Sequence, residues 1–95
     1  MLTQNEINII IETLKPYNPK RIGLFGSVAR NEETENSDID ILYSFNSPIT
    51  LFIKFSIVEA LQSKLHKKVD FVAESSVHLK LKQYIFNDLQ LIYES

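Results

Sequence analysis

The chain has 95 residues, of which 44% are hydrophobic and 23% are charged, and its formal net charge is −2. This length supports one hydrophobic core, so we expect a single domain over residues 1–95. The slight excess of acids leaves no surplus of positive charge for a phosphate backbone, which argues against direct nucleic-acid binding.

The sequence contains no cysteine, which excludes disulfides and thiolate zinc sites. Met1 leads into a polar segment, and no apolar run approaches the roughly 20 residues of a membrane span. We therefore expect a cytoplasmic protein with no membrane contact. A local group of lysines has two open interpretations, solvated helix faces or a phosphate or partner contact: Lys64, Lys67, Lys68, Lys80 and Lys82.

The chain opens with a predicted helix. Thr3 and Glu6 have the spacing of a capping box, in which each side chain bonds a backbone N–H of the other residue. The apolar residues that follow recur at helical spacing and form one face: Ile7, Ile10, Ile11 and Leu14. Pro16 and the turn from Tyr17 to Pro19 end this helix.

A pair of acids lies inside an apolar run farther along the chain. The run from Ser37 to Phe45 predicts a strand, and residues two apart on a strand share a face, so Asp38 and Asp40 would point the same way. Two carboxylates that close repel each other unless a cation lies between them. Mg²⁺ is a hard cation that takes carboxylate and phosphate oxygens together. The pair therefore predicts a magnesium site.

A turn before these acids predicts a phosphate site. The strand predicted from Arg21 to Phe25 stops at Gly26 and Ser27, where a short helix can begin. Glycine lets the backbone approach a ligand closely, and the N–H groups that open a helix, with the Ser27 hydroxyl, can bind phosphate oxygens. A phosphate site facing a metal site is the arrangement that an enzyme needs to transfer a group from a nucleoside triphosphate.

These residues carry a resemblance to a known family. Gly26 and Ser27, ten intervening residues and then Asp38-Ile39-Asp40 resemble the GS-x10-D-x-D signature of the polymerase-β-type nucleotidyltransferase superfamily. The small size and the run GSVAR…SDIDIL are similar to its minimal nucleotidyltransferase (MNT) branch. Members of that branch often serve as antitoxins beside HEPN-domain toxins.

The segment after the turn departs from the family in one place. The family usually has Gly where Asn31 stands, and Asn tolerates the left-handed backbone region, which would keep the turn. Arg30 can reach a phosphate, or it can pair with a nearby acid to hold the turn, and its position a full helical turn beyond the corner favours the structural role. We interpret the acidic loop that follows as a solvated connection: Glu32, Glu33 and Glu35.

The longest predicted helix runs from about Thr50 to Leu65 and has more apolar surface than one face needs. We expect a core-facing stripe made of Leu51, Phe55, Val58, Leu61 and Leu65. Phe52, Ile53, Ile57 and Ala60 widen the surface, either as a second buried contact or as an exposed patch that meets another protein. We interpret His66 as the residue that ends this helix.

A third acid lies alone in the strand predicted from Lys68 to Ala73. Asp70 is either an edge-strand acid facing water or part of a site. The resemblance implies the second interpretation, with Asp70 as the third carboxylate, a metal ligand, a general base near the attacking hydroxyl, or both. The resemblance also implies a helix from about Leu79 to Asn87 and a last strand near Leu89 to Tyr93.

These expectations combine into one architecture and one leading function. We expect an α/β (α+β) fold, with a small mixed sheet of three to four strands, helices mainly on one face and the carboxylate face open. The resemblance implies a transferase that uses ATP and two Mg²⁺ ions to place AMP on a hydroxyl of a cognate HEPN toxin. Two alternatives stay open. The protein is either an antitoxin that neutralises its toxin by occlusion without catalysis, or a small-molecule adenylyltransferase acting as a homo-oligomer.

Overall fold

A four-stranded mixed sheet forms the centre of the molecule in the computed structural model, which describes residues 2–30, 32 and 37–95. The strands lie in the order β3-β2-β1-β4, with β1 at Pro19–Phe25, β2 at Ile39–Phe45, β3 at Val69–Ala73 and β4 at Gln90–Glu94. β1 is antiparallel to β2 and to β4, whereas β2 and β3 are parallel. The predicted α/β class with a small mixed sheet is confirmed.

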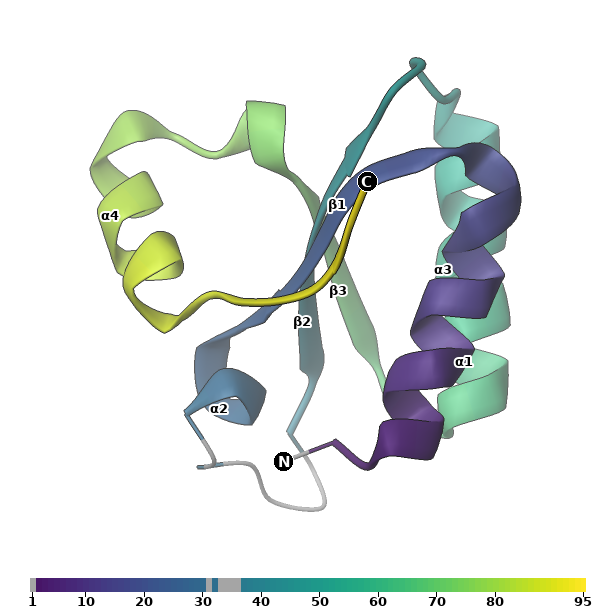
Figure 1. Ribbon diagram of the computed structural model, residues 1–95, viewed down its shortest axis with the longest axis horizontal. Helices are drawn as coiled ribbons and strands as arrows, with labels where there is room; N and C mark the ends of the chain where they lie inside the picture. The colour runs from purple at the N-terminus through teal and green to yellow at the C-terminus, as the bar shows by residue number, and fades with distance from the viewer. Residues whose placement is uncertain (1, 31, 33–36) are drawn as a thin grey trace.

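The helices divide between the two faces of this sheet (Figure 1). The two long helices, α1 (Gln4–Leu14) and α3 (Leu51–Leu65), pack against each other on one face. The short helix α2 (Gly26–Ala29) and α4 (Leu79–Asp88) lie on the other side, so the expectation of helices mainly on one face holds for the two long helices, and the carboxylate face is open only in part. The five lysines that are close in sequence are thereby split between the α3 side and α4, so they do not form one patch. Of the helices in the described part of the chain, none is long and apolar enough to cross a membrane.

The predicted capping box begins α1. The Thr3 hydroxyl accepts a hydrogen bond from the Glu6 backbone N–H at 3.1 Å, and the Thr3 backbone N–H donates to the Glu6 carboxylate at 3.0 Å. Ile10 and Leu14 are fully buried on the face that meets the sheet. A 3₁₀ turn, Lys15–Tyr17, follows, and Asn18 takes the left-handed conformation before β1. The helix and its end are therefore as predicted.

The core lies between the sheet and the α1–α3 layer. On β1 and β2 the side chains that enter it alternate, as the period of two requires: Ile22, Leu24, Ile39, Ile41 and Tyr43. Phe71 of β3 stacks on Tyr43, with ring centroids 3.9 Å apart. The residues between these core positions point to the opposite face of the sheet, which is the face that carries Asp40 and Asp70.

The predicted stripe on α3 was wrong in its first half. Leu51 is 65% exposed and Phe55 is 62% exposed, whereas Ile57, Leu61 and Leu65 are buried. The helix is apolar on most of its circumference, so periodicity alone did not fix which row of side chains meets the sheet. The row at spacing four that ends at Leu65 does so. Phe52, at 81% exposed, belongs to the free face, and His66 ends the helix in the left-handed conformation, as interpreted.

This assignment of faces predicts that two substitutions on α3 will differ greatly in their effect on the free energy of unfolding. Ile57→Ala leaves a cavity in the core and should lower the free energy of unfolding by about 2–5 kcal/mol. Phe52→Ala should change it by no more than about 0.5 kcal/mol, because the ring is largely in solvent. Urea denaturation monitored by circular dichroism measures both. Comparable losses for the two variants would contradict the faces assigned to α3.

Candidate active site

Two of the predicted site carboxylates lie opposite each other on adjacent strands. In the parallel pairing of β2 and β3, the residue partners are Asp40 and Asp70. Ile39 and Ile41 are fully buried in the core, so Asp40 points to the open face between them. Residues that are partners on neighbouring strands have their side chains on the same side of the sheet. The fold therefore brings together two acids that are thirty positions apart in the sequence.

Asp38 precedes β2, although the sequence predicted that it would lie within the strand. β2 begins at Ile39, whose backbone N–H donates to the Lys68 carbonyl at 2.9 Å and whose strand partner is Val69. The residue before it has no partner in the ladder and stays outside the strand. Asp38 is nevertheless near enough to act on Asp40 electrostatically.

The surroundings of Asp40 disfavour its negative charge. Partial burial, followed by the charges of Asp70 and Asp38, raises the pKa of Asp40 to about 6, and Arg30 offsets part of this effect. A carboxyl group with a pKa raised in this way is costly to ionise at neutral pH. The three carboxylates therefore form a negative cluster that a cation would stabilise.

This shift predicts that the metal-free protein becomes more stable when Asp40 is neutral. Because the pKa of Asp40 is higher folded than unfolded, its contribution favours folding below about pH 4 and is lost as the pH rises through about 6. Asp40→Asn should therefore raise the free energy of unfolding at pH 7.5 by on the order of 1 kcal/mol, after allowance for solvent screening. At pH 4 the gain should disappear. Urea denaturation in a chelator at both pH values measures it.

Glu59→Gln is the matched control for this experiment. Glu59 is exposed on α3, which lies on the other face of the sheet, so its neutralisation should give no pH-dependent gain. An Asp40→Asn variant that is less stable than the wild type at pH 7.5 would show that the carboxylate is favourably bonded and not in a repulsive cluster.

The predicted phosphate corner lies directly beside this cluster. Gly26 begins α2 with a positive φ of 73°, a conformation that glycine adopts without steric cost. A Cβ atom built on Gly26 would overlap the Asp40 Oδ2 atom. Only glycine leaves the Asp40 carboxylate in place here, and the backbone of Gly26 and Ser27 can approach a ligand held at that carboxylate.

Arg30 is engaged by two acids at the end of α2. Its Nη1 atom lies 2.7 Å from Asp88 Oδ2, and its Nε atom lies 3.1 Å from Glu32 Oε2. The hydrogen bond to Asp88 and, to a smaller extent, the one to Glu32 raise the pKa of Arg30. These ion pairs agree with the structural role for Arg30, and the Asp88 pair ties α2 to the end of α4. Asn31 and most of the acidic loop, Glu33 and Glu35 included, lie outside the described residues.

The donor chemistry of the cluster fits a hard divalent cation. Among the described residues, no group of three or more His, Cys, Asp or Glu side chains is already gathered as in a bound metal site. The open face nevertheless has carboxylates at Asp38, Asp40 and Asp70. Burial, and then the charges of Asp70 and Asp38, raise the pKa of Asp40. Oxygen donors of this kind are the ligands that Mg²⁺ prefers. A cation that draws these side chains together would relieve the repulsion between their charges.

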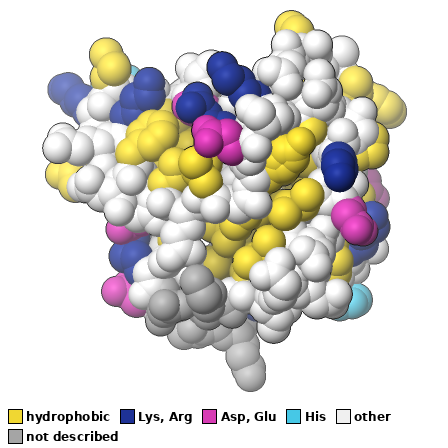
Figure 2. All heavy atoms as spheres, in the orientation of Figure 1, with side chains coloured by type: hydrophobic (Ala, Val, Ile, Leu, Met, Phe, Trp, Pro, Cys, Tyr) yellow, Lys and Arg dark blue, Asp and Glu magenta, His cyan; other side chains and the backbone are white. Residues whose placement is uncertain are grey.

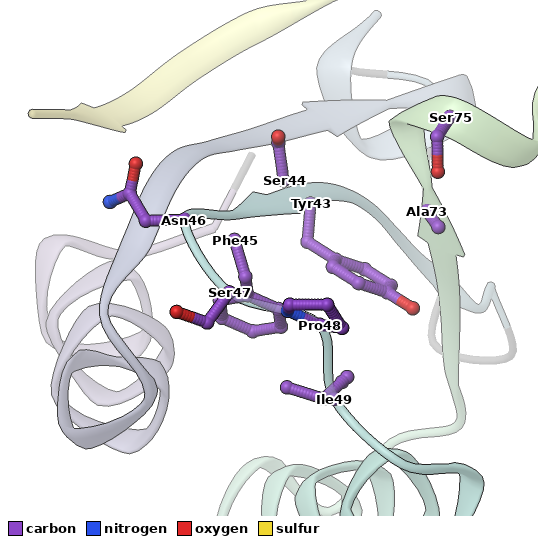
Figure 3. Close-up of a pocket in the computed structure, with 9 residues that line it drawn as sticks. All are labelled: Tyr43, Ser44, Phe45, Asn46, Ser47, Pro48, Ile49, Ala73 and Ser75. Carbon is purple, nitrogen blue, oxygen red and sulfur yellow. The ribbon is translucent and has the colours of Figure 1, made fainter.

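A pocket of about 440 Å³ lies away from these carboxylates, at the C-terminal end of β2 (Figure 3). Its walls come from the segment Tyr43 to Ile49 together with Ala73 and Ser75. None of the predicted site residues lines it. We therefore do not assign it to the candidate active site.

Comparison with known proteins identifies the family. The family model for polymerase beta nucleotidyltransferases matches residues 8–95. The chain belongs to the polymerase beta nucleotidyltransferase family. A relative from Methanocaldococcus jannaschii is 41% identical over 83 residues, covering 82% of this chain and 85% of the relative. The protein adenylyltransferase MntA of Thermococcus cleftensis is 32% identical over 94 residues, covering 94% and 95%.

Solved structures of the family share this fold. A toxin–antitoxin crystal structure with AMP-PNP aligns with a TM-score of 0.83 at 26% identity, covering 94% of this chain and 73% of the other. The toxin–antitoxin structure MntA-HepT aligns with a TM-score of 0.78 at 25% identity, covering 98% and 74%. The structure of a minimal nucleotidyltransferase aligns with a TM-score of 0.80 at 28% identity, covering 92% of this chain and 89% of the other. The chain is thus a nucleotidyltransferase of the minimal type, as the signature around Gly26 and Asp38 indicated.

Proposed function

We propose that this nucleotidyltransferase transfers AMP from ATP to a hydroxyl group of a cognate HEPN toxin and acts as its antitoxin. The observation that carries the proposal is the carboxylate cluster on the open face, where Asp40 pairs with Asp70 beside the Gly26 corner. Relatives support the choice of reaction and partner, because one is a protein adenylyltransferase MntA and others are toxin–antitoxin structures, one with AMP-PNP.

Each site residue has a role in this proposal. Asp38 and Asp40 hold Mg²⁺, with two ions expected, and Asp70 is the third carboxylate. Bound Mg²⁺ would offset the negative charge of the triphosphate and of the displaced pyrophosphate. The backbone of Gly26 and Ser27 positions the phosphates. Arg30, held by Asp88 and Glu32, fixes the end of the turn and does not contact the nucleotide.

The chemistry requires only positioning and one proton transfer. The toxin hydroxyl attacks the α-phosphorus of ATP, an oxygen–phosphorus bond forms, and the bond to pyrophosphate breaks. The proton of the hydroxyl leaves toward a base, for which Asp70 is placed on the strand next to Asp40. Asp70 is exposed on the edge strand β3, so a second protein can reach it. We further propose that residues 1–95 work as one domain in the cytoplasm.

Transfer of label tests this proposal directly. Wild-type protein, Mg²⁺ and α-labelled ATP should label the purified cognate toxin, and peptide mapping should place AMP on a hydroxyl side chain. γ-Labelled ATP is the matched control and should label nothing, because the γ-phosphate leaves with pyrophosphate. Neutralisation of the toxin with no label from either nucleotide would favour the antitoxin that acts by occlusion. Label on a small hydroxyl compound alone would favour the small-molecule transferase.

A further inference from the structure

A second, smaller cavity lies on the open face next to the carboxylate cluster. It has a volume of about 180 Å³, and its floor is formed by Gly23 of β1, Leu42 of β2 and Leu91 of β4. Leu42 follows Asp40 by two residues on the same strand and therefore faces the same way, about 7 Å farther along. None of the predicted site residues lines the cavity, but it lies on the same face of the sheet as Asp40.

The segment between α4 and β4 closes the cavity. Phe86 of α4 and Leu89 line its wall. Leu89 can lie against the sheet because Gly23 has no side chain: a Cβ atom there would be 2.5 Å from Leu89 Cδ1. In Figure 2, hydrophobic side chains gather between α4 and the sheet, with charged side chains beside them. Most of the wall is therefore apolar.

One ion pair gives the cavity a polar edge. Arg21 of β1 and Glu74 make a two-point contact, with Nη2 to Oε1 at 2.7 Å and Nε to Oε2 at 3.2 Å. Both residues line the cavity, and both are only partly exposed. Apolar surface with polar groups at one edge suits a flat heteroaromatic ring, whose faces are apolar and whose rim carries donors and acceptors.

The cavity lies on the nucleotide side of the cluster and not on the acceptor side. Four of its seven lining residues come from β1, β4 and α4, and β1 leads directly into Gly26, whereas Leu42 is on β2 and Glu74 follows β3. Asp70 is on β3, the opposite edge of the sheet. The end of α4 is held beside the phosphate corner by the ion pair from Arg30 to Asp88. A nucleotide with its phosphates at this corner can thus place its base against α4.

We propose that this cavity receives the nucleobase of the nucleotide substrate, with Phe86 as an aromatic wall and the Arg21–Glu74 pair at the polar rim of the base. The inference rests on the proposed function and adds to it the site that recognises the base. The volume suits one ring system and is too small for a whole nucleotide or a peptide segment, so the sugar and phosphates remain outside, toward Gly26.

Calorimetric binding of ATP and of inorganic triphosphate, both with Mg²⁺, tests the proposal. Phe86→Ala should weaken ATP binding about ten-fold, the loss typical of removing one aromatic contact to a base, and should leave triphosphate binding unchanged. Leu91→Trp, at a half-exposed position on β4, should fill the cavity and have the same selective effect. Tyr84→Ala is the control, because Tyr84 lies on α4, is 73% exposed and does not line the cavity.

Several results would overturn the proposal. One is equal weakening of ATP and triphosphate in folded Phe86→Ala or Leu91→Trp, and another is no effect of either variant on ATP. Normal ATP binding with reduced transfer to the toxin would place the acceptor side chain in the cavity instead. Wild-type protein that binds triphosphate as tightly as ATP would exclude a base site while leaving the proposed function intact. Binding of neither ligand would overturn both.

Discussion

Replacing both Asp38 and Asp40 with Asn is expected to abolish metal-dependent nucleotide binding and transfer. In wild-type protein, Mg²⁺ and ATP at one hundred times the dissociation constant should stabilise the folded state by about 2.7 kcal/mol and raise the melting temperature accordingly. The double variant loses the Asp40 carboxylate beside Gly26 and the nearby Asp38 carboxylate, so this gain should vanish and no label should reach the toxin. Differential scanning fluorimetry with and without Mg-ATP measures the shift.

The fold of the double variant should be intact, because the substitutions remove repulsion that the metal-free site contains. Glu12→Gln combined with Glu59→Gln is the matched control. It also removes two acids, but from exposed positions on α1 and α3, on the opposite face of the sheet. The control should keep the full shift with Mg-ATP. A shift that persists in the Asp38, Asp40 variant would exclude these residues as the metal site.

The sequence was sufficient for most of the architecture because local signals agreed with the tertiary packing. The capping box at Thr3 begins α1, and the strands next to Gly26 follow from short apolar runs. The last helix and strand were predicted by resemblance alone, and α4 and β4 confirm them. In α4 no described side chain is buried, so its apolar periodicity had little relation to a core.

Other features depend on contacts between distant residues, which a local pattern does not specify. The apolar circumference of α3 allowed more than one buried row, and in the structure Ile57 is buried whereas Phe55 is exposed. The pairing of Asp40 with Asp70 depends on the parallel register of β2 and β3. The contact of Arg21 with Glu74 joins residues 53 positions apart, and no motif pointed to it.

Asp70→Asn is expected to separate binding from transfer. Transfer of α-label to the toxin should fall about 10²- to 10⁴-fold, the range typical of losing a general base. The dissociation constant for Mg-ATP should change less than the transfer rate, because Asp38 is retained, Asp40 remains beside Gly26 and the phosphate corner is unaltered. Asp70 lies exposed on the edge strand β3, on the side of Asp40 away from β1. Single-turnover label transfer and calorimetry with Mg-ATP measure the two quantities.

Comparison of the loss of transfer rate with the loss of nucleotide affinity distinguishes a base from a merely structural acid. If Asp70 takes the proton, the Asp70→Asn variant should lose transfer rate far more than affinity for Mg-ATP. A water-facing acid on an edge strand predicts unchanged transfer in Asp70→Asn, and a residue needed only for nucleotide binding predicts equal losses of affinity and rate. Either result would remove Asp70 from the proton transfer and leave Asp38 and Asp40 as the chemically active pair.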